Sequence, residues 1–447
     1  MKPADVIATK RDGGEWTSDE LQWFLTGYLT GEIADYQMAA WLMAVCLRGM
    51  SERETADLTR IMAESGDQVD LSGLGSLSAD KHSSGGVGDK TSLIVGPLAA
   101  ACGVKVAKMS GRGLAHTGGT IDKLESIPGF QTDLSLERFM AQVKRVGLVI
   151  AGQTANLAPA DKKLYALRDV TGTVPSIPLI ASSIMSKKIA AGAKNIVLDV
   201  KMGAGAFMRT PEDAAILSKA MTGIGRQLNR RVVAVTTDMN EPLGMAIGNA
   251  LEVKEAIDTL RGQGPKDLLA VSVALAAEMV RLAHDISLDE AVRRVRQAYH
   301  SGQAWQVCMD WIEAQGGETT PTGPSLPETA QKIPVPAPQT GVVAAINALT
   351  IGQGAMDLGA GRAYLGAPID QKVGIVLARR RGDHVQKGDP IAFLHVSHLD
   401  HVERVQGLIQ SAFTFSDQPV APLPLFYGRV DEDGNETDLQ SWLAAFA

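Results

Sequence analysis

The first 65 residues carry apolar side chains at helical spacing. Thr17 and Ser51 each stand three residues before a glutamate, a capping-box pattern that starts a helix. Between the two boxes, residues 38–45 are almost entirely apolar, which is typical of a helix buried on most sides. The pattern predicts a small all-helical domain. Its core is too small to be complete, so we expect it to pack on later helices or on a second copy of the chain.

From residue 73 the pattern changes to short β-branched runs that alternate with helical segments. The runs lie at residues 104–107, 148–151, 196–200 and 232–236. This alternation predicts a larger α/β domain with a mainly parallel central sheet. Residues 159–169 and 182–188 lie between two of these strands, but their pattern is helical.

Beyond residue 335 further strand-like runs predict a C-terminal α+β part resembling a barrel-sandwich fold. Residues 382–391 resemble the turn-and-strand unit of lipoyl and biotinyl carriers, so a carrier module is an alternative interpretation. Carriers present their lysine within Met-Lys-Met or Asp-Lys-Ala, and neither tripeptide occurs in this chain. A mass spectrum without a lipoyl or biotinyl adduct would exclude the carrier.

Composition narrows the class of protein. A chain of 447 residues predicts two or three domains. Its net charge of −7 argues against a nucleic-acid partner, and the lack of an 18-residue apolar run argues against a membrane span. The start of the chain lacks a signal-like apolar core, and the three cysteines show no metal spacing, so we expect a cytoplasmic protein with reduced thiols.

Two glycine-rich clusters carry the candidate chemistry. Residues 81–92 contain three glycines, four hydroxyls, two lysines and a histidine, and residues 110–125 have a similar composition. Backbone N–H groups in such turns bind anions, especially before a helix. One such loop could be a flexible surface turn. Two of them beside apolar runs predict adjacent loops at the ligand-binding edge of a parallel sheet.

The motifs resemble those of the thymidine/pyrimidine-nucleoside phosphorylase family. Residues 81–89, Lys-His-Ser-Ser-Gly-Gly-Val-Gly-Asp, are similar to its phosphate loop, and Ser-Gly-Arg-Gly-Leu-x-His-Thr-Gly-Gly-Thr-x-Asp-x-Leu-Glu from Ser110 is similar to its signature. The resemblance runs from about residue 1 to about 430. It implies a helical domain at 1–66 plus about 157–190, an α/β phosphate-binding domain at 73–156 plus about 193–330, and a C-terminal domain at 335–435. It also implies a homodimer through the helical domain.

The resemblance implies reversible phosphorolysis of pyrimidine nucleosides to a free base and a (deoxy)ribose 1-phosphate. His82, Arg168 and Lys187 match the catalytic positions, with His82 donating a proton or hydrogen bond to the pyrimidine O2. The implied phosphate ligands are Lys81, Ser83, Gly85, Gly86, Ser92, Ser110 and Thr120. The implied base and sugar contacts are Tyr165, Arg168, Ser183, Lys187, Lys108, Leu114 and Phe207. His116 is expected to bond across the cleft when it closes.

Substrate range and ions also follow from the resemblance. Thymidine-restricted relatives tend to carry methionine where Lys108 stands, so we expect thymidine, deoxyuridine and uridine as substrates; a thymidine-restricted enzyme is the alternative. No organic cofactor is implied. A potassium ion is expected on Gly88, Lys90, Leu243, Ala246 and Glu255, where Lys90 replaces a small hydroxyl residue. An anthranilate-type phosphoribosyltransferase is less favoured, because it needs an acidic pair for Mg²⁺ that the sequence does not reveal.

Overall fold

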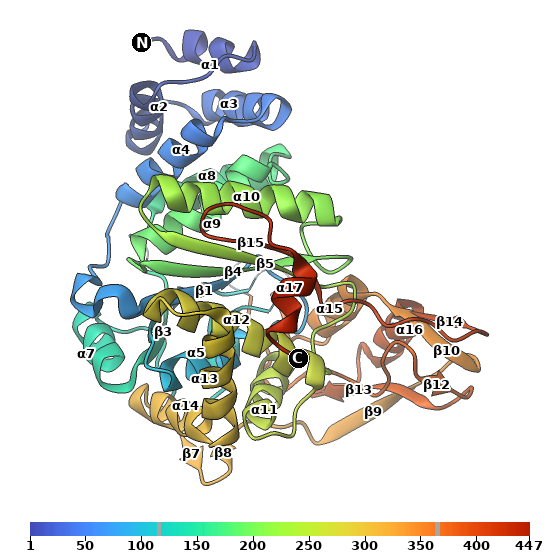
Figure 1. Ribbon diagram of the computed structural model, residues 1–447. Coiled ribbons are helices and arrows are strands. Elements are labelled where there is room, and N and C mark those ends of the chain that lie inside the picture. The colour runs from blue at the N-terminus through green and yellow to red at the C-terminus, as the bar shows by residue number, and fades with distance from the viewer. Residues whose placement is uncertain (114–117, 155, 363–366) are drawn as a thin grey trace.

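A helical bundle stands at one end of the molecule (Figure 1). The computed structural model describes residues 1–113, 118–154, 156–362 and 367–447. The bundle begins with α1 (Pro3–Arg11), α2 (Ser18–Thr30), α3 (Asp35–Arg48) and α4 (Glu52–Glu64). Both expected capping boxes are present, at Thr17 and Ser51. Two later helices, α8 (Pro159–Thr171) and α9 (Ile177–Ala190), complete its apolar core through Ala160, Leu164 and Leu179.

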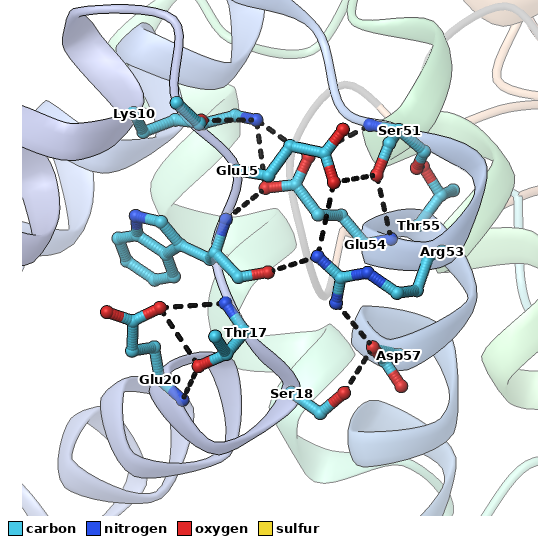
Figure 2. Close-up of polar contacts among 12 residues, drawn as sticks. Lys10, Glu15, Thr17, Ser18, Glu20, Ser51, Arg53, Glu54, Thr55 and Asp57 are labelled. Carbon is cyan, nitrogen blue, oxygen red and sulfur yellow. Dashed lines mark hydrogen bonds and ion pairs between the residues drawn. The ribbon is translucent and has the colours of Figure 1, made fainter.

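A buried ion pair holds α1 on α4 (Figure 2). Lys10 Nζ lies 2.8 Å from Glu54 Oε2, and Glu54 Oε1 accepts from the Trp16 backbone N–H at 2.8 Å. Arg53 extends the network by donating to Trp16 O at 2.5 Å and pairing with Asp57 at 3.1 Å. Removing one member of such a buried pair leaves an uncompensated charge, so the network fixes the packing of the bundle.

The central sheet is mainly parallel, as the sequence predicts. Its strands are β1 (Ser78–Ser83), β2 (Lys105–Ser110), β3 (Leu148–Gly152), β4 (Asn195–Met202), β5 (Arg231–Asp238) and β15 (Phe426–Val430). They lie in the order β15-β5-β4-β1-β2-β3, with only β15 antiparallel. The chain builds β1, β2 and β3 toward one side and then β4 and β5 toward the other. The order therefore switches between β1 and β4, where open α/β sheets bind ligands.

Helices cover both faces of this sheet. The described helices of the α/β part are α5 (Ser92–Ala101), α6 (Thr120–Leu124), α7 (Leu136–Val146), α10 (Pro211–Gln227), α11 (Asn249–Leu260), α12 (Lys266–His284), α13 (Leu288–His300) and α14 (Gln303–Ala314). Helices α5 and α12 share one apolar core with the sheet, whereas α7 and α10 belong to separate cores. None of the helices in the described parts of the chain is both long and apolar enough to cross a membrane.

The C-terminal part is rich in β-structure and exchanges strands with the α/β part. Its elements are β9 (Gln331–Pro336), β10 (Gly341–Ile346), α15 (Ala348–Asp357), β11 (Gly374–Leu377), β12 (His384–Val385), β13 (Pro390–Val396), α16 (Val402–Ala412) and β14 (Phe413–Ser416). Its larger sheet, β6-β11-β13-β9, takes β6 (Ala246–Ile247) from the α/β part. Strand β15 lies within the expected C-terminal range 335–435, but it pairs with β5 at the edge of the central sheet.

The last elements are held by one buried carboxylate. Glu278 of α12 lies 2.7 Å from Arg429 Nε of β15. The same carboxylate accepts from Trp442 Nε1 of α17 (Leu439–Ala444) at 2.8 Å. Burial alone would raise the pKa of Glu278, but Arg429 and Arg281 hold it below its usual range. The pairing of β15 on β5 therefore depends on a charge contact made far away in the sequence.

Candidate active site

The first glycine-rich cluster forms the turn between β1 and α5, at the switch point of the sheet. Gly85 has φ +100°, a conformation that favours glycine. A Cβ at Gly86 would lie 2.5 Å from Met239 Cε, so a larger residue there would have to displace the Met239 side chain. The Ser83 hydroxyl accepts from Gly85 N at 3.2 Å and fixes the start of the turn.

The two glycine-rich clusters lie side by side, as predicted. Lys123 of α6 donates to the Asp89 carbonyl of the first turn at 2.6 Å. Ser83 and Ser110 end the neighbouring strands β1 and β2, while Ser92 and Thr120 begin α5 and α6. These hydroxyl residues are thus held at the carboxyl edge of the sheet; their roles as phosphate ligands remain predictions. Leu114 and His116 lie outside the described residues.

Lys81 lies beneath the turn in a buried cluster of charges. Its ammonium is 3.1 Å from Asp199 Oδ2, 3.8 Å from Asp89 Oδ2 and donates to Thr91 Oγ1 at 2.5 Å. Lys201 approaches the same Asp199 oxygen at 2.9 Å. Although burial alone would raise the pKa of Asp89, Lys81 and the other lysines hold it well below its usual range. Lys81 therefore faces two carboxylates, one of which it shares with Lys201.

Sequence reasoning missed Asp199 and Lys201. Both lie on β4, whose eight residues are all buried. The signal was available, because charged residues within an otherwise apolar buried strand are rare unless they are paired.

A second buried cluster surrounds Lys108 on the neighbouring strand β2. Its ammonium donates to Lys81 O at 2.5 Å and lies 3.4 Å from Asp80 Oδ1. Lys188, at the end of α9, pairs with the other Asp80 oxygen at 2.7 Å and donates to Met109 O at 3.0 Å. Burial lowers the pKa of Lys108 to about 7. Lys108 is therefore partly charged near neutral pH. The contacts of Lys188 join α9 directly to strands β1 and β2 of the sheet.

His82 is held as a neutral imidazole. Burial lowers its pKa well below the usual value, and the charges of Lys188, Lys108, Lys187 and Lys81 lower it further. Of the two roles expected for His82, the structure favours a hydrogen bond from neutral imidazole over proton donation by imidazolium. The influence of Lys187 on this pKa also means that the candidate base site is within electrostatic reach of the phosphate turn.

Ser183 and Lys187 lie on one face of α9, as their spacing predicts. Lys187 Nζ donates to Ser183 Oγ at 3.0 Å and pairs with Asp161 of α8. Asp161, which sequence reasoning missed, orients this lysine. Phe207, with 51% of its surface exposed, lies beside the phosphate turn, 3.8 Å from where a Cβ of Gly85 would be.

Arg168 points into the turn between α8 and α9. Its guanidinium donates to the backbone oxygens of Leu179 at 3.0 Å, Val174 at 2.7 Å and Thr173 at 3.3 Å. The Tyr165 ring lies 5.8 Å from the guanidinium carbon. In this structure Arg168 therefore holds the turn together, and its expected contact with the base stays a prediction.

The residues expected to hold potassium converge, but they do not fit a bound ion. Lys90 Nζ donates to Leu243 O at 3.0 Å, Ala246 O at 2.8 Å and Glu255 Oε2 at 2.5 Å. The ammonium thus takes three of the oxygens that the cation was expected to use.

Comparisons with known proteins agree with this architecture. Three family models match: the glycosyl transferase helical bundle domain at residues 4–66, the glycosyl transferase a/b domain at 76–305, and the pyrimidine nucleoside phosphorylase C-terminal domain at 342–416. A pyrimidine-nucleoside phosphorylase of Bacillus subtilis is 52% identical over 94% of this chain and 98% of its own length.

A second relative of the same name, from Geobacillus stearothermophilus, is 50% identical over 96% of this chain and all of its own length. Among solved structures, anthranilate phosphoribosyltransferase from Thermus thermophilus covers 70% of this chain and 99% of its own, with a TM-score of 0.57. Its sequence identity is 21%, so this likeness shows the fold alone.

Proposed function

Because the chain belongs to the pyrimidine-nucleoside phosphorylase family, we propose that it catalyses the reversible phosphorolysis of pyrimidine nucleosides. The observation that carries the proposal is the glycine-rich turn at the switch point of the sheet, where the Lys188–Asp80 pair at 2.7 Å holds the end of α9 against β1. An oxyanion bound at the turn and a base bound at α9 would lie on either side of one sugar.

In the proposed reaction a phosphate oxygen attacks C1′ as the glycosidic C–N bond breaks. The bonding electrons pass to the pyrimidine, whose O2 and O4 carry the developing negative charge. Lys187 and the Ser183 hydroxyl are suited to stabilise that anion, and neutral His82 to donate a hydrogen bond to O2. Lys81, paired with Asp199, holds its positive charge below the phosphate turn.

The proposed substrates are thymidine, deoxyuridine and uridine. The test is phosphate-dependent release of base from thymidine, uridine and cytidine. Reactions without phosphate are the controls. We expect release from the first two and little from cytidine, whose N4 amino group would face the Lys187 ammonium. Release from thymidine alone would favour the thymidine-restricted alternative, and no release would contradict the proposal.

Lys187 provides a direct test of the base site. Lys187→Ala should lower kcat/KM for thymidine roughly 10²–10³-fold, because it removes a pre-organised charge from the leaving base. Lys162→Ala, at an exposed position on α8, is the matched control and should leave the rate unchanged. A Lys187→Ala enzyme within threefold of the unaltered protein would contradict the assignment.

We also propose a homodimer formed through the helical domain. Three large apolar side chains of α3 are exposed on one face: Tyr36 (76%), Met43 (39%) and Leu47 (75%). Analytical ultracentrifugation of the unaltered protein should show a dimer. The double variant Tyr36→Glu, Leu47→Glu should sediment as a monomer. Ile216→Glu, an exposed apolar position on α10, is the control. A monomeric unaltered protein, or a dimer indifferent to the α3 changes, would contradict this interface.

A further inference from the structure

We propose that the Lys90 ammonium is a built-in replacement for a monovalent cation, so that this chain binds no potassium ion between its phosphate turn and residues 243–246. The lysine belongs to the phosphate turn, and its side chain is fully buried. The three oxygens around it come from two other segments of the α/β part.

We call the carbonyls of Leu243 and Ala246 and the carboxylate of Glu255 the cradle of Lys90. The donors of the ammonium and the acceptors of the cradle match in number. A lysine ammonium has three N–H donors and no acceptor. The carbonyls of Leu243 and Ala246 and the carboxylate of Glu255 take one donor each, at 2.5–3.0 Å. Glu255 is completed by the backbone N–H groups of Met245 at 2.8 Å and Ala246 at 3.2 Å. The ammonium is therefore saturated without a further ligand.

Charge and space both exclude a second cation here. One buried ammonium faces one buried carboxylate, and another cation among the same oxygens would repel the first in a poorly hydrated site. Gly244 has φ +74°, and a Cβ there would lie 2.4 Å from Glu255 Oε2 and 3.1 Å from Lys90 Nζ. A Cβ at Gly88 would lie 2.8 Å from Leu243 O. The backbone thus closes around the ammonium.

The cradle connects the phosphate turn to the C-terminal part. Ala246 belongs to β6, which pairs with β11. Arg380, just after β11, donates to Gly244 O and pairs with Asp267, whose carboxylate accepts from Gly244 N at 3.2 Å. Because the cation is covalently attached, this connection does not depend on the concentration of an ion in solution.

Thermal unfolding of the full chain tests the proposal without any assay of the reaction. A negative result would therefore contradict the Lys90 proposal and leave the proposed function unaffected. Potassium chloride is exchanged for tetramethylammonium chloride at a constant ionic strength of about 0.1 M. The unaltered protein should keep its melting temperature within about 1 °C. Lys90→Ser should melt about 3–5 °C lower in tetramethylammonium and recover at least half of that loss in potassium.

Lys254→Ser is the matched control, because Lys254 lies beside Glu255 in sequence but pairs at the surface with Asp258. It should show neither the loss nor the recovery. A saturable rise in the melting temperature of the unaltered protein with potassium would overturn the proposal. A Lys90→Ser protein that melts lower but gains nothing from potassium would overturn it too. If that variant does not fold, the titration of the unaltered protein still decides.

Discussion

At the scale of single residues, the candidate site is built from buried lysines whose charges are compensated to different degrees. Lys81 faces two carboxylates, whereas Lys108 shares Asp80 with Lys188. Burial lowers the pKa of Lys108 to about 7, and burial together with the neighbouring lysines lowers the pKa of His82 well below its usual value. Each of these two residues gives a prediction that depends on pH.

His82 should make stability fall in mild acid. Its pKa is lowered in the folded protein, so below about pH 6.5 the unfolded chain binds a proton that the folded chain does not. The contribution of neutral His82 to the free energy of unfolding is therefore fully present above about pH 6.5, and it is lost progressively as the pH falls below that value. His82→Asn should weaken the fall in unfolding free energy between pH 6.5 and 5.5 by up to about 1 kcal/mol, measured by urea denaturation. His384→Asn, at an exposed position, should not. Equal slopes in all three proteins would contradict the prediction.

Lys108 should set the preference for uridine over thymidine. If its ammonium bonds the ribose 2′-OH, Lys108→Met should lower the ratio of the two kcat/KM values roughly tenfold. In the unaltered enzyme that ratio should decline as the pH rises through about 7, where Lys108 loses its charge, and in the variant it should be flat.

Lys105→Met, on the same strand, is the control for the Lys108 experiment, because Lys105 donates to the Lys144 carbonyl near the surface. A ratio that Lys108→Met leaves unchanged would remove this residue from sugar recognition without touching the proposed reaction.

At the scale of elements, the α8–α9 turn shows where sequence reasoning reaches its limit. The two helices, and the face shared by Ser183 and Lys187, follow from helical spacing. That Arg168 turns inward to three carbonyls depends on the path of residues 172–176, which no periodicity describes. Local patterns also predict four strands of the central sheet, and each predicted end lies within three residues of the observed one.

Strand pairing over long sequence distances explains the other gaps. β6 has two residues and β15 pairs with β5 from far along the chain, so neither could be placed by a local pattern. The convergence of Lys90 on Glu255 has the same origin, because its partners are distant in sequence and only the tertiary fold joins them. Local patterns identify helices and buried strands, whereas partners across elements require the structure.

Arg168 should contribute to stability as well as to any contact with the base. Arg168→Ala removes donors from three backbone oxygens, two of which are bonded at 3.0 Å or less. We expect the free energy of unfolding to fall by about 2–3 kcal/mol, measured by denaturant unfolding, with Lys162→Ala as the neutral control on the same helix. An unchanged midpoint would mean that the turn is held by other contacts.

At the scale of the whole molecule, the candidate phosphate and base residues lie on different units of the fold. We expect the chain to cross between these units near residues 66–72, 151–156 and 190–194, and residue 155 lies outside the described residues. Lys188 joins them through its buried pair with Asp80, so any relative motion should pivot near that pair. Lys187 lies beside the pivot, and Tyr165 lies farther along the helical unit.

Small-angle X-ray scattering should detect closure about this pivot. The radius of gyration should fall when phosphate and a pyrimidine base are added together, because both halves of the site are then bridged. Phosphate alone and base alone are the controls. A radius that stays constant in an active preparation would indicate a cleft that is already formed.

The return of β15 to the central sheet also affects how the protein is made. At ordinary rates of translation, the stretch from residue 238 to residue 426 takes roughly 10–40 s to synthesise. Throughout that interval the edge of β5 has no partner strand, and Glu278, once it has been made, lacks both Arg429 and Trp442. The sheet is therefore completed only when synthesis is nearly over. A nascent chain stalled after residue 281 exposes a strand edge beside a carboxylate whose partner is Arg281, without Arg429 and Trp442.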